Sequence, residues 1–205
     1  MPLIKDLTSY RFSNAVLPDK FIICGVELKP FCLGHYILLE HIGNPILNPD
    51  PVEVPKEDGL YWFFMALIVC SFSYEDAVTL LNDEQLFTEI SKSFFDNLMK
   101  NMDAEKDWNY FTKINLFKNY LQYYTQMPIY NEENASAESM IASGTDWKTN
   151  IYLIFKKMGY DESKILNMNM KKLFFEWCSY AEAEGAIKVW NRVDLEQYKN
   201  LKGKK

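Results

Sequence analysis

Apolar and polar residues alternate at helical spacing along most of the chain. Apolar side chains step by three and four residues through 83–102 and 105–127, which places them on one face of each helix. The run at 60–70 is continuously apolar but shorter than the roughly 20 residues that cross a bilayer, so it predicts a buried core helix. The pattern predicts a mainly α protein, with helices at 33–42, 60–72, 74–82, 83–102, 105–127, 146–158, 161–167 and 170–185.

Two regions break the helical pattern. Residues 21–28 form two short runs of β-prone residues separated by Gly25, which predicts a small β-hairpin. Residues 43–59 hold four prolines among Asn, Asp and Gly, so neither a helix nor a central strand is expected there. Short polar residues suited to cap helix starts, and glycines suited to end helices, fit the same boundaries: Ser73, Asp83, Thr145 or Asp146 and Asp161 for starts, Gly43, Gly159 and Gly185 for ends.

The composition of the chain changes about two thirds of the way along. Residues 128–145 begin with a proline and continue with Asn, Glu, Ala and Ser, without apolar periodicity. This predicts an N-terminal hairpin and helical domain over 1–128, a linker over 129–145 and a small lobe of three helices over 146–198. The Lys-rich residues 199–205 are expected to form a solvated tail.

Composition narrows the class of protein. Of the 205 residues, 48% are hydrophobic and 16% aromatic, which excludes a disordered chain and allows a sizeable core. A formal net charge of -6 argues against the broad basic surface that nucleic acids require. Four irregularly spaced cysteines predict buried, reduced thiols. The N-terminal residues lack an apolar signal sequence, which predicts that the protein stays in the cytoplasm.

Candidate catalytic and metal-binding residues are few. His35 and His41 are six residues apart, whereas helical metal pairs lie three or four apart, so no metal site is predicted. Cys24 or Cys32 can lie near His35, which leaves open a thiol nucleophile with a histidine base, although no orienting third residue is identifiable. The glycines form no phosphate-binding or dinucleotide-binding pattern. The sequence therefore predicts no catalytic residue and no cofactor, with the Cys/His pair as the enzyme alternative.

The helix at 105–127 carries a wide apolar face. One stripe on it consists of Tyr110, Ile114, Phe117, Leu121 and Tyr124, and a second stripe lies beside it. Such a face either fills the core of its own domain or contributes to a partner interface rich in Tyr and Met. Both interpretations stay open, and the stripe is the candidate partner-binding site.

Two groups of short motifs complete the sequence pattern. The first is LKPFCLGH at 28–35 with LLE at 38–40, GNP at 43–45 and IVCS at 68–71, and the second covers 147–160, ILNM at 165–168, Met170 and the helix at 177–185. These motifs resemble those of tail assembly chaperones of tailed bacteriophages, and together they cover about half of the chain. They are turn, cap and core positions, and the helices at 83–127 have no counterpart in the resemblance.

The resemblance implies a mostly helical protein of the host-cell cytoplasm. Such a chaperone is not an enzyme and binds the long, aggregation-prone tape measure protein while the tail tube assembles. The expected partner is therefore the tape measure protein or another tail protein, without nucleic acid or membrane, and a homo-oligomer is left open. A structural virion protein of the connector, neck or tail is the first alternative, and the small Cys/His-dependent enzyme is the second.

Overall fold

The computed structural model of the chain describes residues 19–47, 56–104, 109–126, 130–132, 146–185 and 187–189. Helices dominate these residues, which confirms the prediction of a mainly α protein with a small N-terminal β-hairpin. The chain divides into two compact units. One unit is Lys20–Thr125, and the other joins Gln126–Lys205 to Met1–Asp19. The division lies close to the boundary expected at residue 128.

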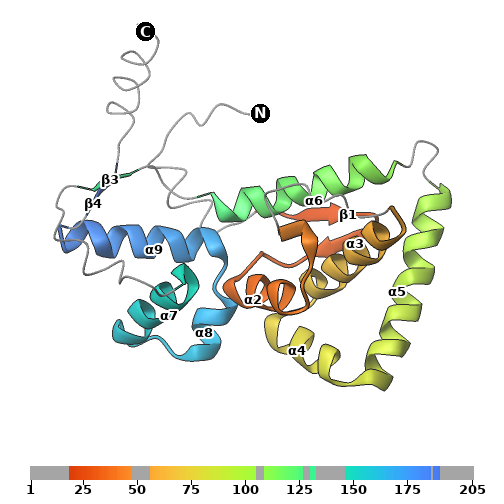
Figure 1. The fold of residues 1–205 in the computed structure, drawn as a ribbon, viewed down its shortest axis with the longest axis horizontal. Coiled ribbons are helices and arrows are strands. Elements are labelled where there is room, and N and C mark those ends of the chain that lie inside the picture. Colours follow the sequence, from red (N-terminus) through yellow and green to blue (C-terminus); the bar gives the residue numbers. More distant parts are fainter. Residues whose placement is uncertain are drawn as a thin grey trace, which may run out of the picture. The chain divides into compact units, whose positions relative to one another are not determined.

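The unit Lys20–Thr125 consists of a hairpin and a set of helices (Figure 1). Its elements are β1 (Phe21–Ile23), β2 (Val26–Leu28), α2 (Leu33–His41), the 3-10 turn η1 (Pro45–Leu47), α3 (Lys56–Ser71), α4 (Tyr74–Asn82), α5 (Glu84–Ala104) and α6 (Tyr110–Thr125). The hairpin lies between α6, which contacts β1, and α3, which contacts β2. This arrangement places the apolar helix α3 in the centre of the unit.

The hairpin is closed by a tight two-residue turn. Strands β1 and β2 pair antiparallel with Phe21 opposite Leu28. The two turn residues, Cys24 and Gly25, have φ values of 53° and 75°, as the right-handed twist of a two-residue hairpin requires. Asn101 of α5 donates a hydrogen bond to the Cys24 carbonyl at 3.2 Å, and a Cβ on Gly25 would clash with the Asn101 side-chain amide. Glycine therefore allows α5 to approach the turn.

Helix α6 packs through aromatic side chains onto the hairpin and α3. Phe21 of β1 lies 5.3 Å from the ring of Tyr120 and 5.1 Å from that of Tyr123. On the α3 side, the ring of Phe63 lies edge-on to Phe117 at 6.1 Å. Such edge-to-face pairs place the positive edge of one ring against the negative face of another, which adds to the hydrophobic gain of burial.

Polar side chains start the helices where the sequence predicts. Ser73 accepts from the Asp76 amide at 3.2 Å, and Asp83 accepts from the Leu86 amide at 2.9 Å. In the other unit, Asp146 and Asp161 accept from amides two and three residues ahead. Each bond satisfies an amide that has no partner within the helix.

Two boundaries differ from the expectation. Helix α3 begins at Lys56, inside the region 43–59 that was predicted to be loop, and η1 forms a short 3-10 turn in the same region. A proline blocks a helix that runs through it, but the helix can begin directly after one. Helix α6 begins at Tyr110 and ends at Thr125, which is shorter than 105–127 at both ends. Residues 48–55 lie outside the described residues.

The second unit contains the three expected helices and a strand pair that was not predicted. The helices are α7 (Trp147–Lys157), α8 (Glu162–Asn167) and α9 (Met170–Ala183). Strand β3 (Tyr130–Glu132) pairs antiparallel with β4 (Ile187–Val189). The segment 129–145 that the sequence predicts as a linker thus contains β3, whose pairing partner lies more than 50 residues ahead. The expected tail at 199–205 lies outside the described residues.

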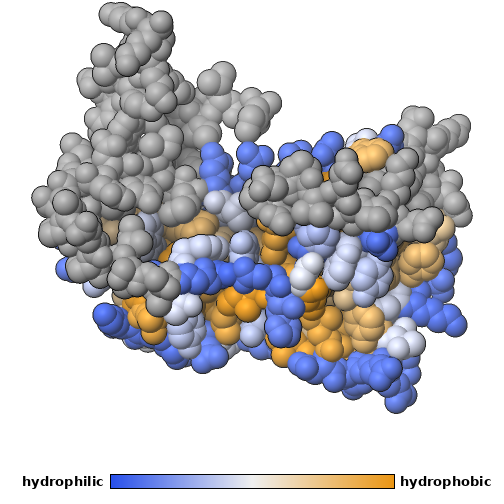
Figure 2. Space-filling model, in the orientation of Figure 1, coloured by the Kyte–Doolittle hydropathy of each residue, from blue (hydrophilic) through white to orange (hydrophobic). Residues whose placement is uncertain are grey.

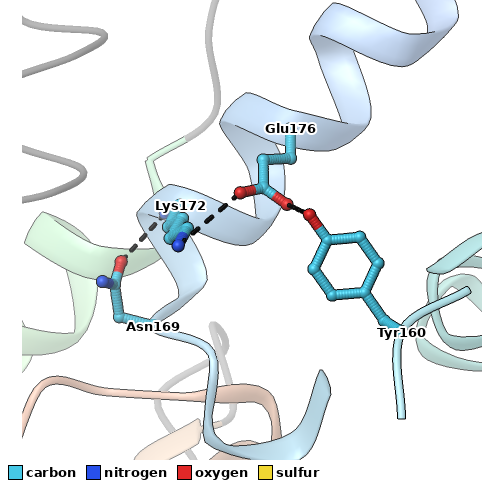
Figure 3. Close-up of polar contacts among 4 residues, drawn as sticks. All are labelled: Tyr160, Asn169, Lys172 and Glu176. Carbon is cyan, nitrogen blue, oxygen red and sulfur yellow. Dashed lines mark hydrogen bonds and ion pairs between the residues drawn. The ribbon is translucent and has the colours of Figure 1, made fainter. Parts of the chain in front are cut away.

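Side chains on α9 hold the loop after α7 (Figure 3). The Tyr160 hydroxyl donates to Glu176 at 2.8 Å, and Lys172 forms an ion pair with the same carboxylate at 3.7 Å. The hydrogen bond to Glu176 raises the pKa of Tyr160. Asn169 caps α9 by accepting from the Lys172 amide at 2.9 Å. These contacts join successive elements of one unit. They give structural roles to Tyr160, Asn169, Lys172 and Glu176.

None of the helices within the described ranges combines the length and the hydropathy that a membrane crossing requires.

Candidate functional site

The stripe predicted to bind a partner lies on α6. Phe117 is fully buried, Tyr124 is 1% and Leu121 is 8% exposed, and Ile114 is half-buried. The side chain of Tyr110 lies outside the described part of the chain. Because the buried members fill the core beside the hairpin and α3, their burial indicates the core interpretation of the stripe. Partner binding by the stripe stays a prediction.

Cys32 and His35 are brought together, as a cap at the start of α2. The Cys32 sulfur accepts from the His35 amide at 3.4 Å, and His35 Nδ1 accepts from the Cys32 amide at the same distance. This is a capping box, with a thiol and an imidazole in the places usually held by a hydroxyl and a carboxylate. The other ring nitrogen, Nε2, lies 3.0 Å from the Phe72 carbonyl.

These contacts fix the state of the histidine. A carbonyl oxygen only accepts, so Nε2 carries the proton, and Nδ1 is bare because it accepts from an amide. Burial lowers the pKa of His35 to about 4, against the smaller opposing effect of the Phe72 carbonyl. The imidazole is therefore neutral at pH 7, with both nitrogens already engaged. It ties α2 to the residue that follows α3.

The pKa of the Cys32 thiol is shifted in the direction opposite to that of a nucleophilic cysteine. Burial raises the pKa of Cys32 to about 12, whereas reactive thiols have a lowered pKa and some exposure. Cys24, the other candidate nucleophile, is also buried and lies in the hairpin turn. The geometry of Cys32 and His35 thus supports a structural role and gives the enzyme alternative no support.

A second buried polar group joins α6 to the end of the hairpin. The Tyr120 hydroxyl donates to the Lys29 carbonyl at 2.8 Å, and the Lys29 amide donates to the Cys70 carbonyl at 2.8 Å. The Cys70 thiol also hydrogen-bonds with Tyr120, and burial raises the pKa of both groups. Both side chains are therefore neutral and serve to connect β2, α3 and α6.

The second histidine does not form part of a metal site. His41 is exposed at the end of α2, while His35 is buried. The acidic side chains of Asp83, Glu84 and Glu89 line an open hollow of about 740 Å³ at the joint of α4 and α5. Among the residues that the structure describes, His, Cys, Asp and Glu nowhere form a group of three or more that could hold a metal ion.

An open apolar groove lies between α3 and α5. Its volume is about 390 Å³, and it is lined by Leu60, Tyr61, Phe64 and Met65 of α3 and by Phe87, Ser91, Phe95, Leu98 and Met99 of α5. We call this feature the α3–α5 groove. In the view of Figure 2, other apolar surface of the same unit is visible over α2 and α4, with hydrophilic residues at the turn into α5.

The floor and the rim of the α3–α5 groove differ in exposure. Met65 and Leu98 form the floor, with 5% and 2% of their surface exposed. At the rim, Tyr61 is 55%, Phe95 is 43% and Met99 is 36% exposed, so large apolar surface faces solvent. An exposed apolar groove of this kind is typical of sites that bind protein segments or ligands.

Besides Tyr61 at the rim, the side chain with a polar group in the lining of the groove is Ser91. Its hydroxyl oxygen is buried and has no hydrogen-bond partner among the residues that the structure describes. An unpaired buried hydroxyl destabilises a protein by about 1–3 kcal/mol. The unpaired hydroxyl of Ser91 in the groove therefore lowers the stability of the folded chain.

Sequence reasoning located α5 but missed the groove. The stripe of Phe87, Ile90, Phe94 and Leu98 indicates one apolar face, and the groove combines Phe87 and Leu98 of this stripe with Ser91, Phe95 and Met99 beside it. The available signal was the surplus of large apolar residues on α5, notably the Phe94–Phe95 pair. Both rings lie 5.6 Å from Phe64, so one residue of α3 contacts both rings of the pair.

Comparison of the chain with models of protein families, with curated proteins and with solved structures finds no match.

Proposed function

We propose that the protein is a non-enzymatic assembly factor of a tailed bacteriophage, a tail assembly chaperone that binds the tape measure protein. One structural observation carries the binding part of the proposal: the α3–α5 groove leaves large apolar side chains of Tyr61, Phe95 and Met99 exposed on an ordered helical unit. A chaperone that keeps a long helical client soluble needs such a surface to cover the apolar face of the client. The identity of the client rests on the sequence resemblance.

The structural account of Cys32 and His35 agrees with a binding role. Both side chains are occupied as a helix cap, so they need no catalytic explanation. On the α6 stripe Phe117 is fully buried, whereas the rim residues Tyr61 and Phe95 of the groove face solvent. The groove is therefore the surface on which the proposal is tested.

The test is co-expression with the tape measure protein encoded in the same genome. The groove variant is Tyr61→Gln with Phe95→Gln, and the matched control is Phe111→Gln with Leu116→Gln, which replaces two exposed apolar residues on α6. Wild type and the control are expected to keep the tape measure protein in the soluble fraction. The groove variant is expected to leave it in the pellet while remaining folded by circular dichroism.

Two results would overturn the proposal. The first is a tape measure protein that stays insoluble with the wild-type chain. The second is the presence of the chain in purified virions at fixed stoichiometry by mass spectrometry, since a chaperone leaves the tail once it is assembled. That result would favour a structural connector, neck or tail protein.

A further inference from the structure

The shape of the α3–α5 groove indicates an elongated occupant. The lining residues of α5 run from Phe87 through Ser91 and Phe95 to Met99 in steps of four residues. At 1.5 Å per residue, this row is roughly 18 Å long, which is about three turns of a helix laid beside it. The exposure of Tyr61 and Phe95 leaves the groove open along this length. An open row of this kind suits a partner helix better than an enclosed small molecule.

Residues 56–104, which include both helices that line the groove, carry the net charge of the whole chain. Residues 56–104 contain nine Asp and Glu against three Lys, a formal charge of -6. The whole chain has 28 Asp and Glu against 22 Lys and Arg, also -6, so the remaining residues are balanced. The acidic charge is thus concentrated on α3, α4 and α5.

The acidic residues of this region lie on the surface. Seven described acidic side chains are exposed, whereas the exposed bases of the same helices are Lys92 and Lys100. The acids are Asp58, Glu75, Asp76, Asp83, Glu84, Glu89 and Asp96. An apolar groove within an acidic surface matches a partner that is apolar on one face and basic around it, because complementary charges favour the right partner and speed its approach.

We propose that the α3–α5 groove binds an amphipathic helix whose apolar face enters between α3 and α5 and whose flanking residues are Lys and Arg. This inference rests on the proposed function, in which the helix belongs to the tape measure client. Anchors spaced three and four residues apart on the helix contact Phe64, Phe95 and Leu98. The basic flanks face Asp58 on α3 and Glu84 on α5, which lie three residues before the lining residues Tyr61 and Phe87 and therefore on the same helix faces.

The experiment compares two fluorescent peptides of about 18 residues, long enough to span the groove. They share the same Leu positions at helical spacing, and their polar faces carry Lys in one peptide and Glu in the other. The Lys peptide is expected to bind the full chain at least about tenfold more tightly by fluorescence anisotropy in about 50 mM salt. The difference is expected to shrink in 1 M salt, because the screening length falls to roughly 3 Å.

Matched variants separate the apolar from the charged contribution. Tyr61→Gln with Phe95→Gln is expected to abolish binding of the Lys peptide, while Phe111→Gln with Leu116→Gln leaves it unchanged. Asp58→Lys with Glu84→Lys is expected to remove the preference for the Lys peptide. The control, Glu182→Lys with Glu184→Lys, makes the same change of charge on exposed residues at the end of α9 and is expected to keep the preference.

The outcomes distinguish this inference from the proposed function. If wild type solubilises the tape measure protein but binds both peptides equally, or binds neither, the basic amphipathic helix is the wrong occupant and the chaperone function stands. If the Lys peptide binds through the groove but the tape measure protein stays insoluble, the occupant chemistry is right and the client is wrong. Equal loss of the preference in the α9 control would show non-specific attraction and overturn the charge argument.

Discussion

The unit Lys20–Thr125 contains two apolar helical faces that look alike in sequence and differ in structure. The stripe on α6 is covered, because Phe21 of the hairpin packs against Tyr124 and Phe63 of α3 packs against Phe117. The α3–α5 groove is open, and its rim residues Tyr61 and Phe95 are about half exposed. Both faces show helical spacing of large apolar residues, so the spacing identifies the face of the helix without saying what covers it.

The contrast in coverage between the two faces shows which apolar faces support a functional hypothesis. Periodicity is a property of one helix, whereas burial depends on elements that are distant in the sequence. On α6, the neighbour is a hairpin some 90 residues earlier, as the hydrogen bond from Tyr120 to Lys29 shows. On the groove face of α5, no described element packs over Phe95 in the same way, and its side chain is 43% exposed. A partner surface is therefore identified from the fold, which shows which apolar faces are covered and which are open.

The largest expected effect comes from truncating one phenylalanine on each face. Phe117→Ala is expected to lower the free energy of unfolding by about 3–5 kcal/mol, because it leaves a cavity in the core beside Phe63. Phe95→Ala is expected to lower it by about 1 kcal/mol or less, because much of its ring is already in water. Urea denaturation of both variants measures the difference. Similar losses of unfolding free energy in the two variants would show that Phe95 contributes to the core as much as Phe117 does.

An intermediate effect is expected from removing a hydroxyl on each face. Tyr120→Phe deletes the buried hydroxyl that donates to the Lys29 carbonyl and is expected to cost about 1–3 kcal/mol of unfolding free energy. Tyr61→Phe is the matched control on the groove rim, where Tyr61 is 55% exposed, and its expected change is within about 0.5 kcal/mol. Thermal or urea unfolding provides the measurement. An unchanged stability of Tyr120→Phe would show that the carbonyl finds another donor.

The smallest expected effect is a gain in stability at Ser91. Ser91→Ala removes a buried hydroxyl without a partner among the described residues and places a better helix former on α5. The free energy of unfolding is expected to rise by about 1 kcal/mol. Ser179, which is exposed on α9, is the control, and Ser179→Ala is expected to gain only a few tenths of a kcal/mol from helix propensity. A loss of stability in Ser91→Ala would mean that the hydroxyl is satisfied.

Much of the fold was predictable because helix boundaries depend on local residues. Helix α4 occupies Tyr74–Asn82, as expected, because Ser73 caps its start and the next cap, Asp83, follows its end. Gly159, with φ of 87°, follows the end of α7 as expected. The strands β3 and β4 were missed because each has three residues and their pairing depends on a partner far along the chain.

The candidate site was less predictable, for the same physical reason. The sequence brings Cys32 and His35 within three residues, but only the structure shows that both imidazole nitrogens are engaged by the backbone. It also assigns an apolar stripe to α6 without deciding between core and interface. The groove needs α3 and α5 side by side, which neither helix encodes alone, so Tyr61 and Phe95 could not be singled out beforehand.

The strand pair in the second unit has a consequence for the modularity of the chain. Pairing of β3 with β4 brings residues 130–132 and 187–189 side by side, so the two ends of the segment 130–189 are adjacent. Between these ends, α7 contacts α8 and α9, which are close to it in sequence. A segment with adjacent ends and local contacts can be inserted, removed or permuted with little change to the rest of a protein. The C-terminal helices therefore lie in a segment whose two ends are adjacent, the layout that circular permutation requires.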